Sequence, residues 1–399
     1  MRLGTEVHLP AAAKAAPAPS AHVTVAVNVI RVRAWRLGAL IFLGLVVACV
    51  ASPTRTGAVP TTVSPEPTIS DTPRAAGETS TASSARLVTA PTLNGRQAVY
   101  RGAEIGFVAY PSGTFAADPG ANFDNVDAVT VTRGLPKLRG SGGVTYDAMS
   151  KRWLPVWAWQ LSPDGLSYAY VELILAPAPA QPGPRGWIRN EIHVVEIASA
   201  ADRIVWTGGP GDQYRVAAFR PEGIYLTKGC NAGCSPDIGR LWRFDTATAQ
   251  VTTVTSIQAD WVITGEYAYG FEGDPTALST LNGPLLRVDL INGTVTQVMS
   301  SGPRANVQAI GPDGTIYAEL LDPEAGSGGR WLFAVDSQGR RQGIAVVPTG
   351  YLGIRRPVAD GEGLWFADGR GLWLYRTGSG VSLMSHETVV MPAGPLLHA

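Results

Sequence analysis

Alternating hydrophobic and polar positions recur along residues 144–384 and predict many short β-strands. Six similar segments stand out, and each is an alternating strand that ends at an acidic or polar corner before a second strand begins. The strand-and-corner parts are residues 144–147, 193–196, 242–245, 286–289, 333–336 and 373–376. Successive corners are 40 to 49 residues apart, which is the length of one four-stranded blade of a β-propeller.

A second repeated signal lies between the corners. Residues 162–165 read Ser-Pro-Asp-Gly, and related tetrads occupy residues 220–223, 311–314 and, in a weaker form, 360–363. Proline presets φ at the second position of a turn, and the final glycine suits a left-handed conformation, so each tetrad predicts a tight hairpin. An aromatic or apolar strand follows each tetrad, as in Tyr168-Ala-Tyr170.

These Ser-Pro-Asp-Gly turns followed by an aromatic strand resemble the TolB-like, or PD40, family of bacterial β-propellers. The resemblance covers residues 157–376 through three good copies of the turn and one weak copy. It implies a propeller fold, and this fold hosts many unrelated activities. Family members of known role include an envelope scaffold that binds partner proteins and the propeller domains of some peptidases. The sequence has no Gly-x-Ser-x-Gly elbow, so the resemblance does not extend to peptidase machinery.

The predicted fold is therefore all-β, a propeller of six four-stranded blades over residues 93–399, with seven blades as the alternative. We expect residues 93–140 to supply the inner strands of the first blade. The apolar C-terminal stretch, residues 387–399, is expected to add a strand to that blade and close the ring, which removes open sheet edges. Ten of the eleven tryptophans lie in this domain, and most are expected to pack between neighbouring blades.

The N-terminal region predicts export from the cytoplasm. Arg31, Arg33 and Arg36 precede an uncharged apolar run, residues 37–48, and small residues lead to Cys49. This order resembles the signal peptide of a bacterial lipoprotein. The resemblance implies that Cys49 carries the lipid and becomes the first residue of the mature chain.

The segment 31–51 has a second interpretation as an uncleaved membrane anchor. Its apolar run is shorter than the roughly 20 residues that cross a bilayer, which favours the lipoprotein. Residues 1–30 form a prefix that we set aside for fold prediction. Residues 52–92 are rich in Ser, Thr, Pro and Ala and contain no aromatic residue, so they predict a disordered tether.

The charge balance limits the kinds of partner. Lysine plus arginine equals aspartate plus glutamate, at 32 each. Because no net positive field attracts a polyanion, nucleic acid is not an expected partner. We expect a monomer outside the cytoplasm that binds an envelope protein, a glycan or a small ligand.

Two cysteines of the propeller region predict a disulfide. Cys230 and Cys234 lie in a Gly-rich loop that can bend enough to close a bridge between them. A metal site there would need two further ligands, and the histidines of the domain are not paired at ligand spacing. Two free thiols would fit a domain that stays in the cytosol. We expect neither a metal nor a cofactor.

The corner acids are the first candidates for chemistry, and we assign them to turns. Each directly precedes a hairpin turn, where a short acidic side chain can accept hydrogen bonds from the backbone N–H groups of the turn. We therefore do not expect a ring of catalytic carboxylates. These acids are Asp147, Glu196, Asp245, Asp289 and Asp336.

The candidate binding residues lie in the longest inserts instead. Residues 173–189, 227–239, 271–283 and 320–330 join the second and third strands of successive blades, and such loops gather at one mouth of a propeller channel. The residues are Arg185, Trp187, Asp237, Glu272, Asp274, Asp322, Glu324 and Arg330. Solvated loops without a ligand are the alternative.

The sequence contains no metalloprotease helix motif, phosphate loop, dinucleotide fingerprint or calcium loop. His193 is interpreted as an ordinary strand residue. These observations favour a non-catalytic ligand- or protein-binding module. The alternative is a propeller hydrolase or lyase that uses Asp274, Asp322, Glu324 and Arg330 around the mouth of the channel.

Overall fold

The computed structural model describes residues 86–124, 126–176, 187–210, 212–229, 237–273, 283–300, 305–321, 330–347, 357–388 and 390–398. Cys49 and the signal segment 31–51 lie outside the described residues, as do Cys230 and Cys234. Where the chain is described, none of its helices is long and apolar enough to cross a bilayer.

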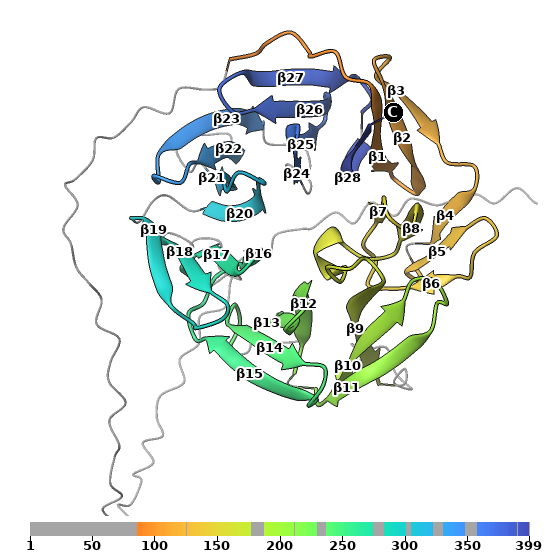
Figure 1. Ribbon diagram of the computed structural model, residues 1–399, viewed down its shortest axis with the longest axis vertical. Coiled ribbons are helices and arrows are strands. Elements are labelled where there is room, and N and C mark those ends of the chain that lie inside the picture. The colour runs from red at the N-terminus through yellow and green to blue at the C-terminus, as the bar shows by residue number, and fades with distance from the viewer. Residues whose placement is uncertain are drawn as a thin grey trace, which may run out of the picture. The chain divides into compact units, whose positions relative to one another are not determined.

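The described strands form eight small antiparallel sheets, which make up the seven blades of a β-propeller around a central axis (Figure 1). Four of the blades, numbered 4 to 7, are complete and consecutive in sequence. They comprise β12 (Tyr214–Arg220), β13 (Gly223–Lys228), β14 (Leu241–Asp245) and β15 (Gln250–Thr255); β16 (Val262–Thr264), β17 (Tyr267–Phe271), β18 (Leu285–Asp289) and β19 (Val295–Met299); β20 (Ala305–Ile310), β21 (Ile316–Leu321), β22 (Arg330–Val335) and β23 (Arg341–Val347); and β24 (Val358–Asp360), β25 (Gly363–Asp368), β26 (Gly371–Arg376) and β27 (Gly380–Ser385).

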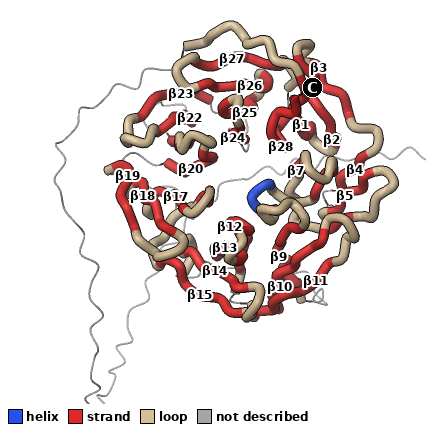
Figure 2. The backbone as a smooth tube through the Cα atoms, viewed as in Figure 1, coloured by secondary structure: helices blue, strands red, loops and turns tan. Residues whose placement is uncertain are grey.

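The first three blades are less regular. Blade 1 has the order β28 (Val390–His398), β1 (Gly95–Arg101), β2 (Glu104–Tyr110) and β3 (Thr114–Ala117). Blade 2 combines the sheet of β4 (Ala121–Asp124), β5 (Val129–Thr132) and β6 (Leu138–Arg139) with the pair β7 (Thr145–Asp147) and β8 (Arg152–Leu154). Blade 3 has β9 (Ser167–Leu175), β10 (Trp187–Glu196) and β11 (Asp202–Gly208), and a 3₁₀ helix, η1 (Ala158–Gln160), lies toward the centre of the ring beside it (Figure 2).

Each pair of neighbouring blades encloses its own hydrophobic core. The core between blades 4 and 5, for example, contains Tyr225 from β13 together with Trp261 and Val288 from the next blade. Strands in the middle of a blade are buried on both faces, because a neighbouring blade covers each side, whereas the outermost strand β15 is largely exposed. Within blade 4, the glycine of the tetrad turn allows β13 to approach β14 closely, since Gly223 has φ +141° and a Cβ there would lie 2.4 Å from the Phe244 carbonyl oxygen.

The C-terminal strand closes the ring, as the sequence predicts. β28 pairs antiparallel with β1, with Val390 opposite Arg101 and His398 opposite Gly95. Residues 93–140 do not supply the inner strands of the first blade, however. β28 is the innermost strand of blade 1, β1 to β3 lie outside it, and residues 121–154 form a separate blade.

This division explains the blade count, which is seven and not six. The third strand of blade 1 ends at Tyr110-Pro111 and therefore has no acidic corner to mark it in the sequence. The corner at Asp147 belongs to β7, which is not the third strand of a regular blade. The repeat of corners thus misses one blade.

The two faces of the ring differ in the length of their connections. Antiparallel pairing places the links between second and third strands, residues 176–186, 229–240, 272–284 and 322–329, on the same face as the links between blades. We call this the loop face. On the opposite, turn face, the links between described strands are short, such as residues 246–249, 290–294 and 336–340.

Most tryptophans pack between blades, as the sequence predicts. Trp153 and Trp365 are completely buried, and Trp242 and Trp373 are each 8% exposed within inter-blade cores. Trp159 is an exception among the tryptophans with described side chains, because it is 44% exposed and stacks on Trp157 with ring centroids 5.7 Å apart. Trp157 directly precedes η1 and Trp159 is its middle residue, and η1 lies toward the centre of the ring (Figure 2).

Candidate functional site

The structure describes some of the predicted binding residues and not others. Arg185, Asp274, Asp322 and Glu324 lie outside the described residues, so their convergence at one mouth stays a prediction. Trp187 and Arg330 are the first residues of β10 and β22, which places both on the loop face. Only Asp237 and Glu272 have described side chains.

Asp237 belongs to a network of charges on blade 4. Its Oδ1 lies 2.6 Å from Nη1 of Arg240, and its Oδ2 lies 3.8 Å from Nζ of Lys228. The same ammonium group is 3.7 Å from Oδ1 of Asp212 and 5.3 Å from the ring centroids of both Tyr214 and Trp242. This carboxylate is therefore neutralised by its neighbours and helps to hold a largely buried lysine.

The aromatic residue Tyr214 of this network is buried from solvent. Burial, with smaller contributions from Asp212 and Asp237, raises the pKa of Tyr214 to about 12. Glu272, in contrast, is exposed just beyond β17, where it forms an isolated bridge with Ala259. The described part of the predicted site thus contains one structural carboxylate and one that is open to a partner.

Two further charges on the loop face were not predicted. Arg215 lies near the start of β12, and Asp260 lies just before β16, so both sit where an innermost strand meets this face. Asp260 has a solvent-exposed surface, but protein atoms crowd its carboxyl, and this desolvation raises its pKa. The positive charge of Arg215 offsets part of the rise.

The corner aspartates act in turns, as the sequence predicts. Asp245, for example, accepts the backbone N–H of Ala247 at 2.8 Å, and Asp289 accepts that of Ile291 at 2.8 Å. Glu196 differs, because its carboxylate accepts the hydroxyl of Ser199.

A separate cluster of titratable side chains lies between blades 2 and 3. In the antiparallel pair of β9 and β10, Glu172 is opposite Glu191 and Tyr170 is opposite His193. Alternate residues of a strand point to the same side, so these four side chains share one face of the sheet. This face packs against blade 2, because Tyr170 is part of the core that contains Leu138.

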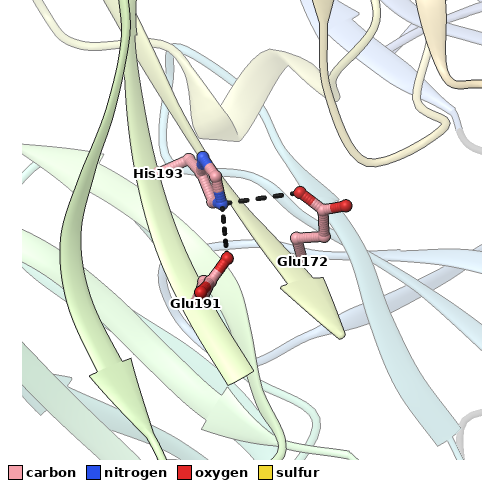
Figure 3. Close-up of side chains that lie close together, drawn as sticks. All are labelled: Glu172, Glu191 and His193. Carbon is pink, nitrogen blue, oxygen red and sulfur yellow. Dashed lines mark ion pairs between the residues drawn. The ribbon is translucent and has the colours of Figure 1, made fainter. Parts of the chain in front are cut away.

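The imidazole of His193 lies between the two glutamates. Its Nε2 is 3.6 Å from Oε2 of Glu172 and 3.6 Å from Oε2 of Glu191 (Figure 3). The side chains of His193 and Glu191 are only 8% and 7% exposed, whereas Glu172 is 33% exposed. The cluster is therefore buried on one side and reaches solvent on the other.

The opposite edge of the imidazole is fixed by Asp202. The Nδ1 of His193 is 2.8 Å from Oδ1 of Asp202, and the Tyr170 hydroxyl donates to Oδ2 of the same carboxylate at 2.8 Å. The Tyr170 ring also stacks on the imidazole at 4.6 Å. Burial and the bond to Asp202 raise the pKa of Tyr170, so its hydroxyl stays protonated and donates.

Each glutamate is also held by an arginine through its other oxygen. Oε1 of Glu191 is 2.7 Å from Nε of Arg189, and Oε1 of Glu172 is 3.7 Å from Nη2 of Arg139, which belongs to blade 2. Both carboxylates thus direct Oε2 toward His193. One imidazole nitrogen and two carboxylate oxygens are types of atom that ligate divalent metal ions.

Sequence reasoning missed this cluster and treated His193 as an ordinary strand residue. The local signal was present, since Tyr170-x-Glu172 and Glu191-x-His193 place polar side chains on a strand face that would otherwise be apolar. The cross-strand register that joins the two pairs could not be read from the sequence, and Arg139 comes from a blade that the repeat did not reveal.

Fold and sites together define a seven-bladed β-propeller with one loop-rich face and one polar cluster between blades. Neither a family model nor a curated protein matches the sequence. Among solved structures, the chain is similar to TolB from Acinetobacter baumannii, with 13% identity over 77% of this chain and 68% of that chain and a TM-score of 0.42.

Two other similar structures are enzymes. An oligogalacturonate lyase in complex with manganese has 12% identity over 72% of this chain and 76% of that chain, with a TM-score of 0.40. The acylaminoacyl peptidase from Pyrococcus horikoshii has 11% identity over 71% of this chain and 47% of that chain, with a TM-score of 0.43. Similarities at this level carry no inference about activity.

Proposed function

We propose that the chain is a membrane-tethered, extracytoplasmic propeller that binds a ligand or protein partner at its loop face without catalysis. The observation that carries this proposal is the asymmetry of the ring. The strand ends joined by the long connections 229–240 and 272–284 lie on one face, while the described links on the other face are tight turns. Long loops on a rigid scaffold are the usual place for recognition.

The tether and its position support the same proposal. Cys49 and the preceding apolar run provide an anchor, and residues 52–92 provide a spacer. The end of this segment is ordered, because Arg86 and Val88 form backbone hydrogen bonds with Val381 of β27. We propose an envelope protein, a glycan or a small ligand as the partner, and a monomeric propeller. With equal numbers of acidic and basic residues, the chain has no field that would recruit nucleic acid.

One predicted residue of the loop face supports binding without catalysis. Asp237 is paired with Arg240 and Lys228, so it is not available as a general acid or base. The alternative, a hydrolase or lyase, depends on Asp274, Asp322, Glu324 and Arg330, whose side chains are not described. It would be favoured if single alanine variants of these residues abolished an activity found with envelope polysaccharides or peptides.

The binding proposal is tested by charge reversal on the two faces. Glu272 is exposed on the loop face, and Glu196 is exposed at a corner of the turn face, so Glu272→Lys and Glu196→Lys are matched variants. We expect the first to lose a partner that wild type recovers from envelope extract, and the second to keep it. Equal recovery by both variants, or loss in both, would contradict binding through the loop face.

A further inference from the structure

We propose that Glu172, Glu191 and His193 form a binding site for one divalent first-row transition-metal ion, such as Zn²⁺, between blades 2 and 3. The site would use Oε2 of each glutamate and Nε2 of the imidazole (Figure 3). It is separate from the loop-face binding proposed above, and neither proposal depends on the other.

The distances fit a shared ion. Zn²⁺ lies about 2.0–2.2 Å from nitrogen and oxygen ligands, so two ligands at a tetrahedral angle are roughly 3.4 Å apart. The two separations from Nε2 are both 3.6 Å. All three ligand atoms lie within 4.8 Å of one another. Small side-chain rotations are enough to bring them onto one ion.

The three atoms are also all electron-pair donors, which favours a cation between them. When Nδ1–H of His193 donates to Asp202, Nε2 presents a lone pair to two carboxylate oxygens, which are themselves acceptors. In the described part of the chain, Nε2 has no hydrogen-bond partner. A proton on Nε2 would not resolve this, because 3.6 Å is too long for a hydrogen bond to either glutamate.

The surrounding residues orient the ligands as in known metal sites. A metal-bound histidine usually donates its other N–H to a carboxylate, and ligating carboxylates are held by further hydrogen bonds. Asp202 fills the first role, and it is itself fixed by Tyr170. Arg189, 2.7 Å from Oε1 of Glu191, fills the second role, and Arg139 forms a longer ion pair of 3.7 Å with Oε1 of Glu172.

The ligand set selects the class of ion. Imidazole nitrogen suits Zn²⁺, Cu²⁺, Fe²⁺ and Ni²⁺, whereas Ca²⁺ and Mg²⁺ prefer all-oxygen sites. Three protein ligands leave a further position open, and Glu172 is the one ligand with substantial exposure, so this position faces the solvent side of the gap. All three ligands belong to blade 3, and blade 2 contributes only Arg139, which pairs with Glu172.

The test is Zn²⁺ binding to tag-free, chelator-treated protein, measured by calorimetry and by metal analysis after dialysis. We expect one Zn²⁺ per chain, with Ca²⁺ unable to compete. His193→Gln and Glu191→Gln should weaken binding by about 100-fold or more, and Asp202→Asn by about 10- to 100-fold through loss of orientation. Co²⁺ bound in place of Zn²⁺ should give a visible absorption spectrum that Asp202→Asn shifts.

Three controls keep the result interpretable. Glu172→Gln changes a partly exposed side chain, so its apo form should unfold like wild type while its affinity falls. His398→Gln removes an exposed histidine 3.8 Å from Glu362 and should bind as wild type does. Cys230→Ser/Cys234→Ser should also retain binding. Failure to bind Zn²⁺ at high micromolar concentration would overturn the proposal, and so would loss of binding only in the cysteine variant.

Discussion

Asp368, the last residue of β25, is a nearly buried carboxylate whose ionisation the fold favours. Its side chain is 2% exposed, forms an ion pair with Arg370 and accepts the indole N–H of Trp373 at 2.9 Å. Burial raises the pKa of this carboxyl, but the bonds from Arg370 and Trp373 lower it by more, so the pKa lies below its usual value near 3.8.

This depressed pKa predicts loss of stability in acid. A carboxyl with a lower pKa in the folded state stabilises the fold above its unfolded pKa, and this contribution disappears as the pH falls through the folded pKa. We expect the melting temperature to change little from pH 7 to 5 and to fall below about pH 4. Asp368→Asn should be less stable at pH 7 and should show a weaker acid dependence. An unchanged slope in thermal melts from pH 3 to 7 would contradict this.

Trp153 shows how much one buried side chain contributes to the apolar core. It is completely buried between blades 1 and 2, and its indole N–H donates to Asp118 at 3.0 Å. We expect Trp153→Ala to reduce the free energy of unfolding by about 3–5 kcal/mol, because it leaves a large cavity. Denaturant titration measures this value. Trp159→Ala, at a side chain that is 44% exposed, is the control and should cost far less.

Single residues also show how far sequence reasoning reaches. The turn role of Asp245 and the positive φ of Gly223 follow from local chemistry, so both could be predicted. The His193 cluster, with Asp202 and Arg139, joins four strands from two blades, and a local pattern does not contain that information. The convergence of Asp274, Asp322 and Glu324 remains a prediction for the same reason.

At the scale of elements, ring closure depends on one strand. β28 pairs with β1 along its length, and Val390 and Leu396 are buried in the core between blades 7 and 1. Deletion of residues 390–399 would leave the inner edge of β1 unpaired and open this core. We expect the truncated chain to lose its cooperative thermal transition and to aggregate.

A peptide of residues 387–399 provides the control for this deletion. When added in trans, it should restore the transition at least in part, because it can pair with β1. The account would fail if the truncated chain alone unfolded with the melting temperature of wild type.

The elements also explain why the architecture was predictable and the blade number was not. A tetrad turn and an acidic corner together mark blades 3, 4 and 6 in the sequence, and an acidic corner alone marks blade 5. Blade 1 is assembled from both ends of the domain, and blade 2 is built from two small sheets, so neither follows that repeat. Tertiary pairing, rather than local pattern, defines these blades.

At the scale of the whole molecule, the proposed anchor is testable on its own. If Cys49 is lipidated, mass spectrometry of membrane fractions should find a lipid-modified N-terminal peptide that begins at this residue. Cys49→Ser should release the protein from the membrane fraction or block its processing. Recovery of an unmodified peptide that spans Cys49 would contradict the lipoprotein and favour the uncleaved anchor.

The central claim is that the tethered ring recognises its partner through the loop face. The most direct measurement is site-specific photo-cross-linking in intact cells, with the reactive amino acid placed at Glu272 on the loop face or at Ala247 on the turn face, both of which are exposed. We predict a discrete cross-linked product from position 272 and none from position 247. Products from position 247 alone, or the same products from both positions, would contradict the account.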